Sequence, residues 1–243
     1  RAVTDADIAT LNGCRVTAAR MPPVDAAMAW FENNDVNAAN CSTVHHAAAA
    51  SDIVVCRLTA EVRLKKGDDP IAADGPAHAG WVIGSRKSNR GDLLYSHLDV
   101  YVGCPVTMYV NNKLTKYSVA RGSRGHVVGS FPALETLPAD DADVLLPTGS
   151  SHKVRRLHRL PDVLFVYVPG STVRFPQLPE GVFPVKPVSS PCHVHGHKDK
   201  MRVTQFPIKL NFAWTCHKLQ GKTEPSVVMG CTNRTLNYNY TAM

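Results

Sequence analysis

The sequence lacks a complete phosphate-binding P-loop, although it contains "GKT" at positions 221–223. A P-loop needs another glycine five positions before Gly221, because both glycines let backbone N–H groups turn around the phosphates. Cys216 stands at that position, and the bulky residues "HKLQ" fill the interval. No other segment of the chain fits the pattern. The sequence therefore argues against nucleotide binding through a P-loop of this chain.

Three further features are absent or scarce. The seven cysteines show no Cys-x-x-Cys spacing, and their odd number and scatter predict reduced thiols inside a cell. No apolar run reaches 18 residues, which predicts no membrane-spanning helix and no membrane partner. Acidic residues number 20 against 27 Lys and Arg, a formal net charge of +7. This excess favours an anionic partner, nucleic acid first.

The two ends of the sequence suggest a longer protein. Residue 1 is arginine rather than methionine, and the chain stops at Met243 within a pattern typical of a helix. We therefore expect a fragment.

Alternating helix and strand patterns predict an α/β sheet that is interrupted by a β-rich insertion and then resumed. Expected helices cover 3–12, 33–50, 208–220 and 232–243, and expected strands cover 26–31, 52–64 and a buried segment at 226–230. A long loop is expected at 65–91, short strands and turns at 93–132, 162–169 and 183–188, and an acidic loop at 135–151. The expected divisions are 1–92, 93–204 and 205–243.

Basic residues are concentrated between His152 and Lys209, where ten of them stand against Asp162, Glu180 and Asp199. Such a local excess predicts an anion-binding surface in the β-rich part, with a solvated surface as the alternative. The basic residues are Lys153, Arg155, Arg156, Arg159, Arg174, Lys186, Lys198, Lys200, Arg202 and Lys209.

The segment "WTCHKLQGKT" is the strongest candidate for chemistry. Thr215, His217 and Lys218 follow an apolar run, and Gly221 is suited to ending a helix. A hydroxyl, an imidazole and an ammonium group together can contact phosphates. Chemistry alone leaves a second interpretation open, in which an ordinary amphipathic helix exposes these polar residues.

The longer segment "FPIKLNFAWTCHKLQGKT" resembles motif V of superfamily-one DNA helicases of the PIF and RecD type. The shared residues are Thr215, His217, Lys218, Gln220, Gly221 and Thr223, whereas Leu219 replaces the family's serine. The block "VYVGCPVTMYVNN" with "RGSRGHVVG" is similar to a second family segment, although Arg121 replaces its usual asparagine. The block "AWFENNDVNAANCSTV" resembles a third.

The resemblance implies an incomplete, RecA-like second domain of the P-loop NTPase type, with an inserted small β-barrel. It implies an ATP-dependent DNA helicase that translocates on single-stranded DNA and unwinds duplex in repair, recombination or telomere maintenance. The expected location is the nucleus or mitochondrion if the source is eukaryotic. The alternatives are a nucleic-acid-binding module without a motor and a degenerate remnant of a mobile-element helicase.

The resemblance also assigns roles to residues. Thr215, His217 and Lys218 are expected to bind DNA, and Gln220, Gly221 and Glu224 are expected near the nucleotide. ATP and Mg²⁺ are expected to be shared with a missing first domain, because an ATPase needs the phosphate cradle, the metal and an arginine together. No catalytic residue is expected in this chain, and the fragment alone is expected to be inactive.

Other candidate sites have weaker support in the sequence. Cys192, His193, His195 and His197 are possible zinc ligands, but ligands so close in sequence cannot all close one tetrahedral site without strain. We therefore expect no metal site. His45 and His46 are expected on a helix surface, and the acidic residues at 140–143 in a solvated loop.

Overall fold

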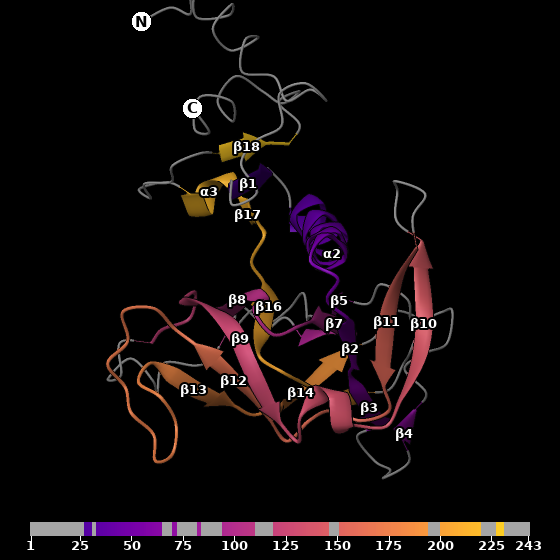
Figure 1. Cartoon of the computed structure of the whole chain (residues 1–243). Coiled ribbons are helices and arrows are strands. Elements are labelled where there is room, and N and C mark those ends of the chain that lie inside the picture. The colour runs from indigo at the N-terminus through magenta and orange to yellow at the C-terminus, as the bar shows by residue number, and fades with distance from the viewer. Residues whose placement is uncertain are drawn as a thin grey trace, which may run out of the picture. The chain divides into compact units, whose positions relative to one another are not determined.

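The computed structural model describes residues 27–30, 33–64, 70–71, 82–83, 94–109, 119–145, 151–193, 200–219 and 227–230. The chain forms two compact units, residues 1–39 with 212–243 and residues 40–211. The described residues form a mixed α/β structure, mostly strand, with one long helix (Figure 1). No helix within these ranges is long and apolar enough to cross a membrane. The helices predicted at 3–12 and 232–243 lie outside the described residues.

The first unit contains a three-stranded parallel sheet with β1 (Ala27–Trp30) at its centre. β17 (Ala213–Thr215) and β18 (Val227–Met229) pair with its two edges. The strand predicted at 26–31 is confirmed. The strand predicted at 226–230 also forms, but Val227 is 44% exposed, so its predicted burial is wrong.

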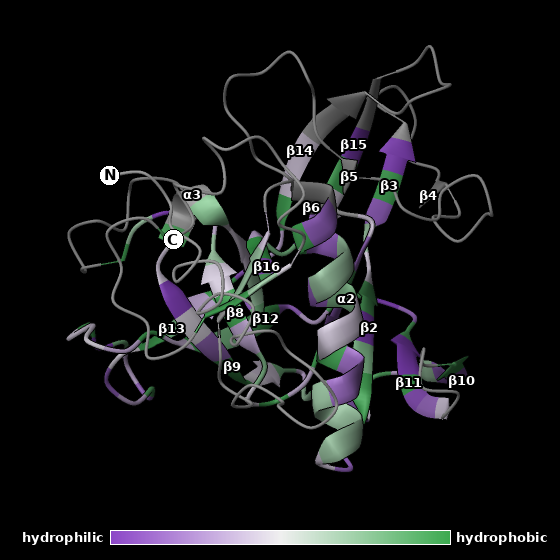
Figure 2. Cartoon of the chain, turned by 90° about the horizontal axis from the view of Figure 1, so that it is seen from above, coloured by the Kyte–Doolittle hydropathy of each residue, from purple (hydrophilic) through white to green (hydrophobic). Residues whose placement is uncertain are grey.

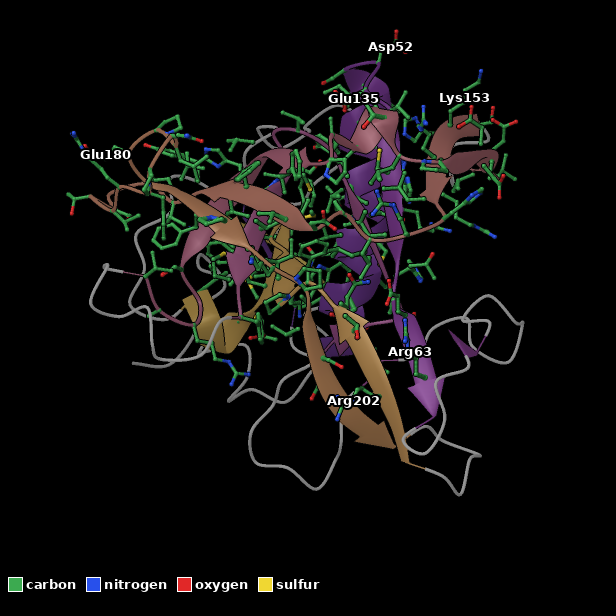
Figure 3. The ribbon with its side chains drawn as sticks, turned by 90° about the horizontal axis from the view of Figure 1, so that it is seen from below. Asp52, Arg63, Glu135, Lys153, Glu180 and Arg202 are labelled. Atoms are coloured by element: carbon green, nitrogen blue, oxygen red, sulfur yellow. The ribbon has the colours of Figure 1, made fainter. Side chains whose placement is uncertain are left out.

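Helix α2 (Asn33–Ala50) confirms the helix predicted from its polar start and alanine-rich continuation. Asp35 lies in the first turn, where its charge complements the helix dipole. The helix stops where Asp52 adopts a left-handed φ of 51° and the N–H of Ile53 donates to the Ala48 carbonyl over 2.9 Å. Figure 3 labels Asp52 at this end, and Figure 2 shows α2 lying alongside β2.

The predicted strand at 52–64 is two strands that join different sheets. Gln205, fully buried, links the two sheets by donating from its side-chain amide to the Leu58 carbonyl over 2.9 Å. One sheet has the order β10 (Ala139–Leu145), β11 (Ser151–Leu157), β2 (Val55–Thr59), β7 (His97–Val100). The other has the order β14 (Val188–His193), β15 (Lys200–Gln205), β3 (Glu61–Leu64), β4 (Pro70–Ile71).

A five-stranded antiparallel sheet completes the second unit, beside the small pair β5 (Val82–Ile83) and β6 (Leu94–Tyr95) and the 3-10 turn η2 (Leu134–Thr136). One face of this sheet is buried, with Val106, Val127, Leu164 and Val166 fully inaccessible. The strand order is β13 (Val182–Val185), β12 (Val163–Tyr167), β9 (Arg124–Phe131), β8 (Pro105–Met108), β16 (Ile208–Leu210). The strands predicted at 93–132, 162–169 and 183–188 are thus confirmed.

Two predicted elements are wrong. Within the acidic loop predicted at 135–151, residues 139–145 form strand β10, which pairs along its whole length with β11, and residues 146–150 lie outside the description. The helix predicted at 208–220 is instead β16, β17 and the single turn α3 (Cys216–Leu219). Pairing between strands overrides the local pattern in both segments, with the next strand β11 in the first and with the remote strands β8 and β1 in the second.

A buried ion cluster fastens α2 to the sheet of β2 and β7. Asp99, only 4% exposed, accepts two hydrogen bonds from Arg57, with Nε at 2.8 Å and Nη2 at 2.7 Å. His45 Nε2 lies 2.9 Å from the same carboxylate and donates to it. Three segments remote in sequence therefore meet at one carboxylate. The surface position predicted for His45 is wrong, because His45 is buried.

The cluster fixes the ionisation of Asp99. Burial alone raises the pKa of Asp99, but the hydrogen bonds from Arg57 and His45 outweigh it and hold the pKa well below its ordinary value of 3.8. The ion cluster therefore stabilises the fold fully at pH values above the ordinary pKa of 3.8. Its contribution to stability is lost as the pH falls toward the lower pKa of Asp99 in the folded state. Beside it, burial lowers the pKa of His97.

We predict that Asp99→Asn destabilises the second unit by about 3 kcal/mol, the lower end for breaking a buried ion pair. The lower end applies because Arg57 is 22% exposed and keeps some contact with water. The measurement is urea unfolding followed by circular dichroism. The matched control is Asp140→Asn, since Asp140 contacts His158 at 2.9 Å on the surface and such pairs contribute about 1 kcal/mol or less. Equal losses in the two variants would contradict the prediction.

Candidate nucleic-acid interface

The parallel sheet of the first unit brings three chain segments to one edge. Trp30 pairs with Thr215, and Met229 pairs with Ala29, so β1, β17 and β18 end side by side. Ligands of parallel α/β sheets commonly bind at the carboxyl ends of the strands. This edge is therefore the place where a ligand of the first unit is expected.

Thr215 lies at this edge as the last residue of β17, and its side chain is half-exposed. The turn α3 follows at once and contains His217 and Lys218, whose side chains lie outside the description. The predicted nucleotide-proximal residues Gln220, Gly221 and Glu224 also lie outside the described residues, as do Lys222 and Thr223. The structure thus places the start of the motif at the sheet edge.

Trp30 is a neighbour of Thr215 that the sequence interpretation missed. Its indole covers Gly230, where an added Cβ atom would lie 2.2 Å from the ring atom Cε3. The N–H of Gly230 donates to the Ala29 carbonyl over 2.8 Å, which fixes this close approach. Only a glycine at position 230 leaves room for the ring. No local signal in the sequence identifies this contact, because 200 residues separate its two sides.

Part of the basic stretch at 152–209 stands opposite acidic residues within its own sheet. Each acidic residue of β10 stands opposite a basic residue of β11, and such cross-strand pairs are stabilising. Lys153 is labelled on this hairpin in Figure 3. The register pairs Asp140 with Arg156, Asp141 with Arg155, and Asp143 with Lys153. The acidic residues thus face cations on a strand, which corrects their predicted place in a solvated loop.

A different part of the stretch concentrates like charges. Arg202 of β15 stands directly opposite Arg63 of β3, and Figure 3 shows both side chains on these neighbouring strands. Like charges opposite each other destabilise a sheet. Glu61, at 3.9 Å from Arg63, offsets part of the repulsion. This sheet face is therefore one place where an anion would be stabilised.

The possible zinc ligands considered from the sequence lie partly outside the described residues. Cys192 and His193 belong to β14 by their backbone, and their side chains lie outside the description. His195 and His197 are not described. Within the described ranges no group of three or more His, Cys, Asp or Glu side chains could hold a metal ion. The described cysteines Cys41, Cys56, Cys104 and Cys216 are free thiols.

No family profile and no curated protein sequence matches the chain, but solved structures do. A structure of two coordinating Pif1 helicases unwinding forked duplex DNA matches with a TM-score of 0.54 and 16% identity, over 99% of this chain and 40% of that chain. Bacteroides Pif1 bound to single-stranded DNA matches with a TM-score of 0.53 and 15% identity, over 99% and 42%. Bacteroides Pif1 in complex with ADP-AlF3 and single-stranded DNA matches with a TM-score of 0.52 and 14% identity, over 99% of this chain and 43% of that chain.

The chain spans less than half the length of these structures. At identities of 14–16% the likeness is one of fold. The resemblance to PIF-type helicases found in the sequence blocks is nevertheless confirmed by an alignment that covers 99% of the residues. The chain is therefore Pif1-like in fold over almost its whole length.

Proposed function

We propose that this chain is part of an ATP-dependent DNA helicase that translocates on single-stranded DNA and unwinds duplex. The observation that carries the proposal is the position of Thr215. It ends β17 at the carboxyl edge of a parallel sheet and leads directly into the turn with His217 and Lys218. A hydroxyl at such an edge, with two basic residues next in the sequence, is suited to contacting phosphates.

In this proposal the parallel strands β1, β17 and β18, with α2 following β1, belong to a RecA-like second domain. Strands β8, β9, β12 and β13 belong to the inserted small barrel, and β16, which pairs with β8, lies in the returning segment. The divisions 1–92, 93–204 and 205–243 are retained as part of the proposal, as are a role in repair, recombination or telomere maintenance and a nuclear or mitochondrial location.

ATP would bind with the help of residues that this chain does not supply. The sequence has no complete P-loop, and the described residues contain no cluster of three metal ligands. Phosphoryl transfer requires both a phosphate cradle and a metal ion, so the described residues do not fit ATP and Mg²⁺ by themselves. The contribution proposed for this chain is the grip on the DNA strand.

We predict that the chain binds single-stranded DNA weakly and with strong salt dependence. If several phosphates are contacted, affinity for oligo(dT) should fall by orders of magnitude between about 50 and 200 mM salt, because bound cations are released. Fluorescence anisotropy of a labelled oligonucleotide measures this. No binding at about 50 mM salt, or binding that does not change with salt, would contradict the proposed function.

A second prediction separates the two lysines of the motif. Lys218→Ala should weaken binding to single-stranded DNA by about 1–3 kcal/mol, because a charge-assisted phosphate contact is lost. The matched control is Lys222→Ala, which removes the same charge at a position that varies in the helicase motif. Both variants are titrated with the same oligonucleotide. If Lys222→Ala abolishes binding while Lys218→Ala has no effect, the motif is wrongly assigned.

A further inference from the structure

The five-stranded sheet has a second face that the core does not use. Along β9 and β12, side chains alternate between the buried face and this outer face. Val127 and Val166 point into the core and are fully buried. His126 and Tyr167, their neighbours in sequence, therefore lie on the outer face.

A β-bulge sets which residues meet on the outer face. The register of β12 against β9 shifts between Phe165 and Val166, which leaves Val128 as the extra residue. Val128 is 42% exposed. After the shift Phe165 stands opposite Gly129, and its Cδ2 atom lies 3.8 Å from where a Cβ of that glycine would be. The half-buried Phe165 ring thus covers a bare stretch of backbone.

Two further aromatic groups extend this face on either side of Phe165. The rings of His126 and Tyr167 are in contact, with centroids 5.4 Å apart. At the other end Phe131 stands opposite Val163 and is 63% exposed. Exposing a phenyl ring to water gives up the free energy that its burial would contribute. Phe131 therefore contributes little to the fold.

Basic groups accompany the aromatic ones. Arg124 lies on β9 two residues before His126, hence on the same face, and is half-exposed. In the preceding turn Arg121 lies over the ring of Tyr109, with Cζ 4.9 Å from the centroid. The five strands of this sheet contain no Asp or Glu. The strands of the outer face therefore carry aromatic residues and Arg124 but no acidic residue. Asp162, just before β12, lies 3.9 Å from Arg159, which offsets its charge.

We propose that this outer face is a stacking platform for the bases of single-stranded nucleic acid, with Phe131, Phe165 and Tyr167 as the stacking rings and Arg124 beside them for the backbone. Aromatic rings bind bases of any sequence through their π-faces, and nearby cations attract the phosphates. The inference rests on the proposed function in taking single-stranded DNA as the partner. It assigns that partner a second surface, apart from Thr215 and Lys218.

Charge favours nucleic acid over an apolar protein segment as the occupant. The phosphates of a nucleic acid are attracted by cations and repelled by carboxylates. Here Arg124 lies at one end of the aromatic row, and acidic residues are absent from the five strands. The net charge of +7 for the chain acts in the same direction.

The test compares two oligonucleotides with the same number of phosphates. Oligo(dT) of about 16 nucleotides and an abasic oligomer of equal length are titrated against the wild-type chain and Phe131→Ser. We expect the wild type to prefer oligo(dT). Phe131→Ser should weaken binding to oligo(dT) roughly tenfold and leave binding to the abasic oligomer unchanged. The variant removes the stacking of one base and keeps every phosphate contact. Phe165→Leu should have the same selective effect.

The control is Leu145→Ser, which removes another exposed apolar side chain, 75% exposed on β10, and should change neither affinity. If an aromatic variant loses affinity equally for both oligomers, the platform is overturned and the proposed function stands. The same holds if neither aromatic variant loses affinity while the wild type still binds. Self-association of the wild type that Phe131→Ser abolishes, without any base-dependent binding, would assign the face to protein contact and also overturn it. Failure of the wild type to bind either oligomer overturns the proposed function itself.

Discussion

The carboxylate of Asp99 is the constraint on which the second unit depends. It is almost fully buried, and it stays charged because Arg57 and His45 donate to both of its oxygens. Removing a buried carboxylate's partners costs far more than a surface pair contributes. The cluster therefore selects one register of β2 against β7, in which Arg57 stands opposite Asp99, and one rotation of α2. His152 of β11 adds an edge-on ring contact to His45, with centroids 5.9 Å apart.

The two four-stranded sheets of the second unit separate next to this cluster, between β2 and β3. Strands β2 and β3 are nearly continuous in sequence, yet each belongs to a different sheet, with Gln205 bridging them. The charges follow the same division. The cations of β11 stand opposite acidic residues of β10, whereas β3 and β15 place two arginines opposite each other. Opposite charges thus face each other in one sheet and like charges in another, which total charge alone does not reveal.

Local sequence was enough to predict those helices and strands whose hydrophobic pattern agrees with their tertiary surroundings. The strand β1, the helix α2 and the strands β12 and β13 were predicted from such patterns and are confirmed. The segments 135–151 and 208–220 were predicted wrongly, because their structure depends on partners elsewhere in the chain: β11 for the first, β8 and β1 for the second. His45 was misplaced for the same reason, since its partner Asp99 lies 54 positions away.

At the candidate site too, contacts between residues far apart in sequence could not be predicted. Thr215 was predicted from a motif and lies at a sheet edge where a ligand is expected, whereas the indole of Trp30 over Gly230 is visible only in three dimensions. The outer face of the five-stranded sheet depends on a bulge that no periodicity reports, and its rings come from strands more than 30 residues apart.

The central claim is that this chain grips single-stranded DNA, and photocrosslinking tests it most directly. Oligonucleotides containing 5-iodouracil would be crosslinked to the chain, and the attached peptides would be identified by mass spectrometry. The account predicts crosslinks to the peptide with Thr215, His217 and Lys218 and to the aromatic residues of β9 and β12. Crosslinks confined to other segments, such as the β10–β11 hairpin, would contradict it.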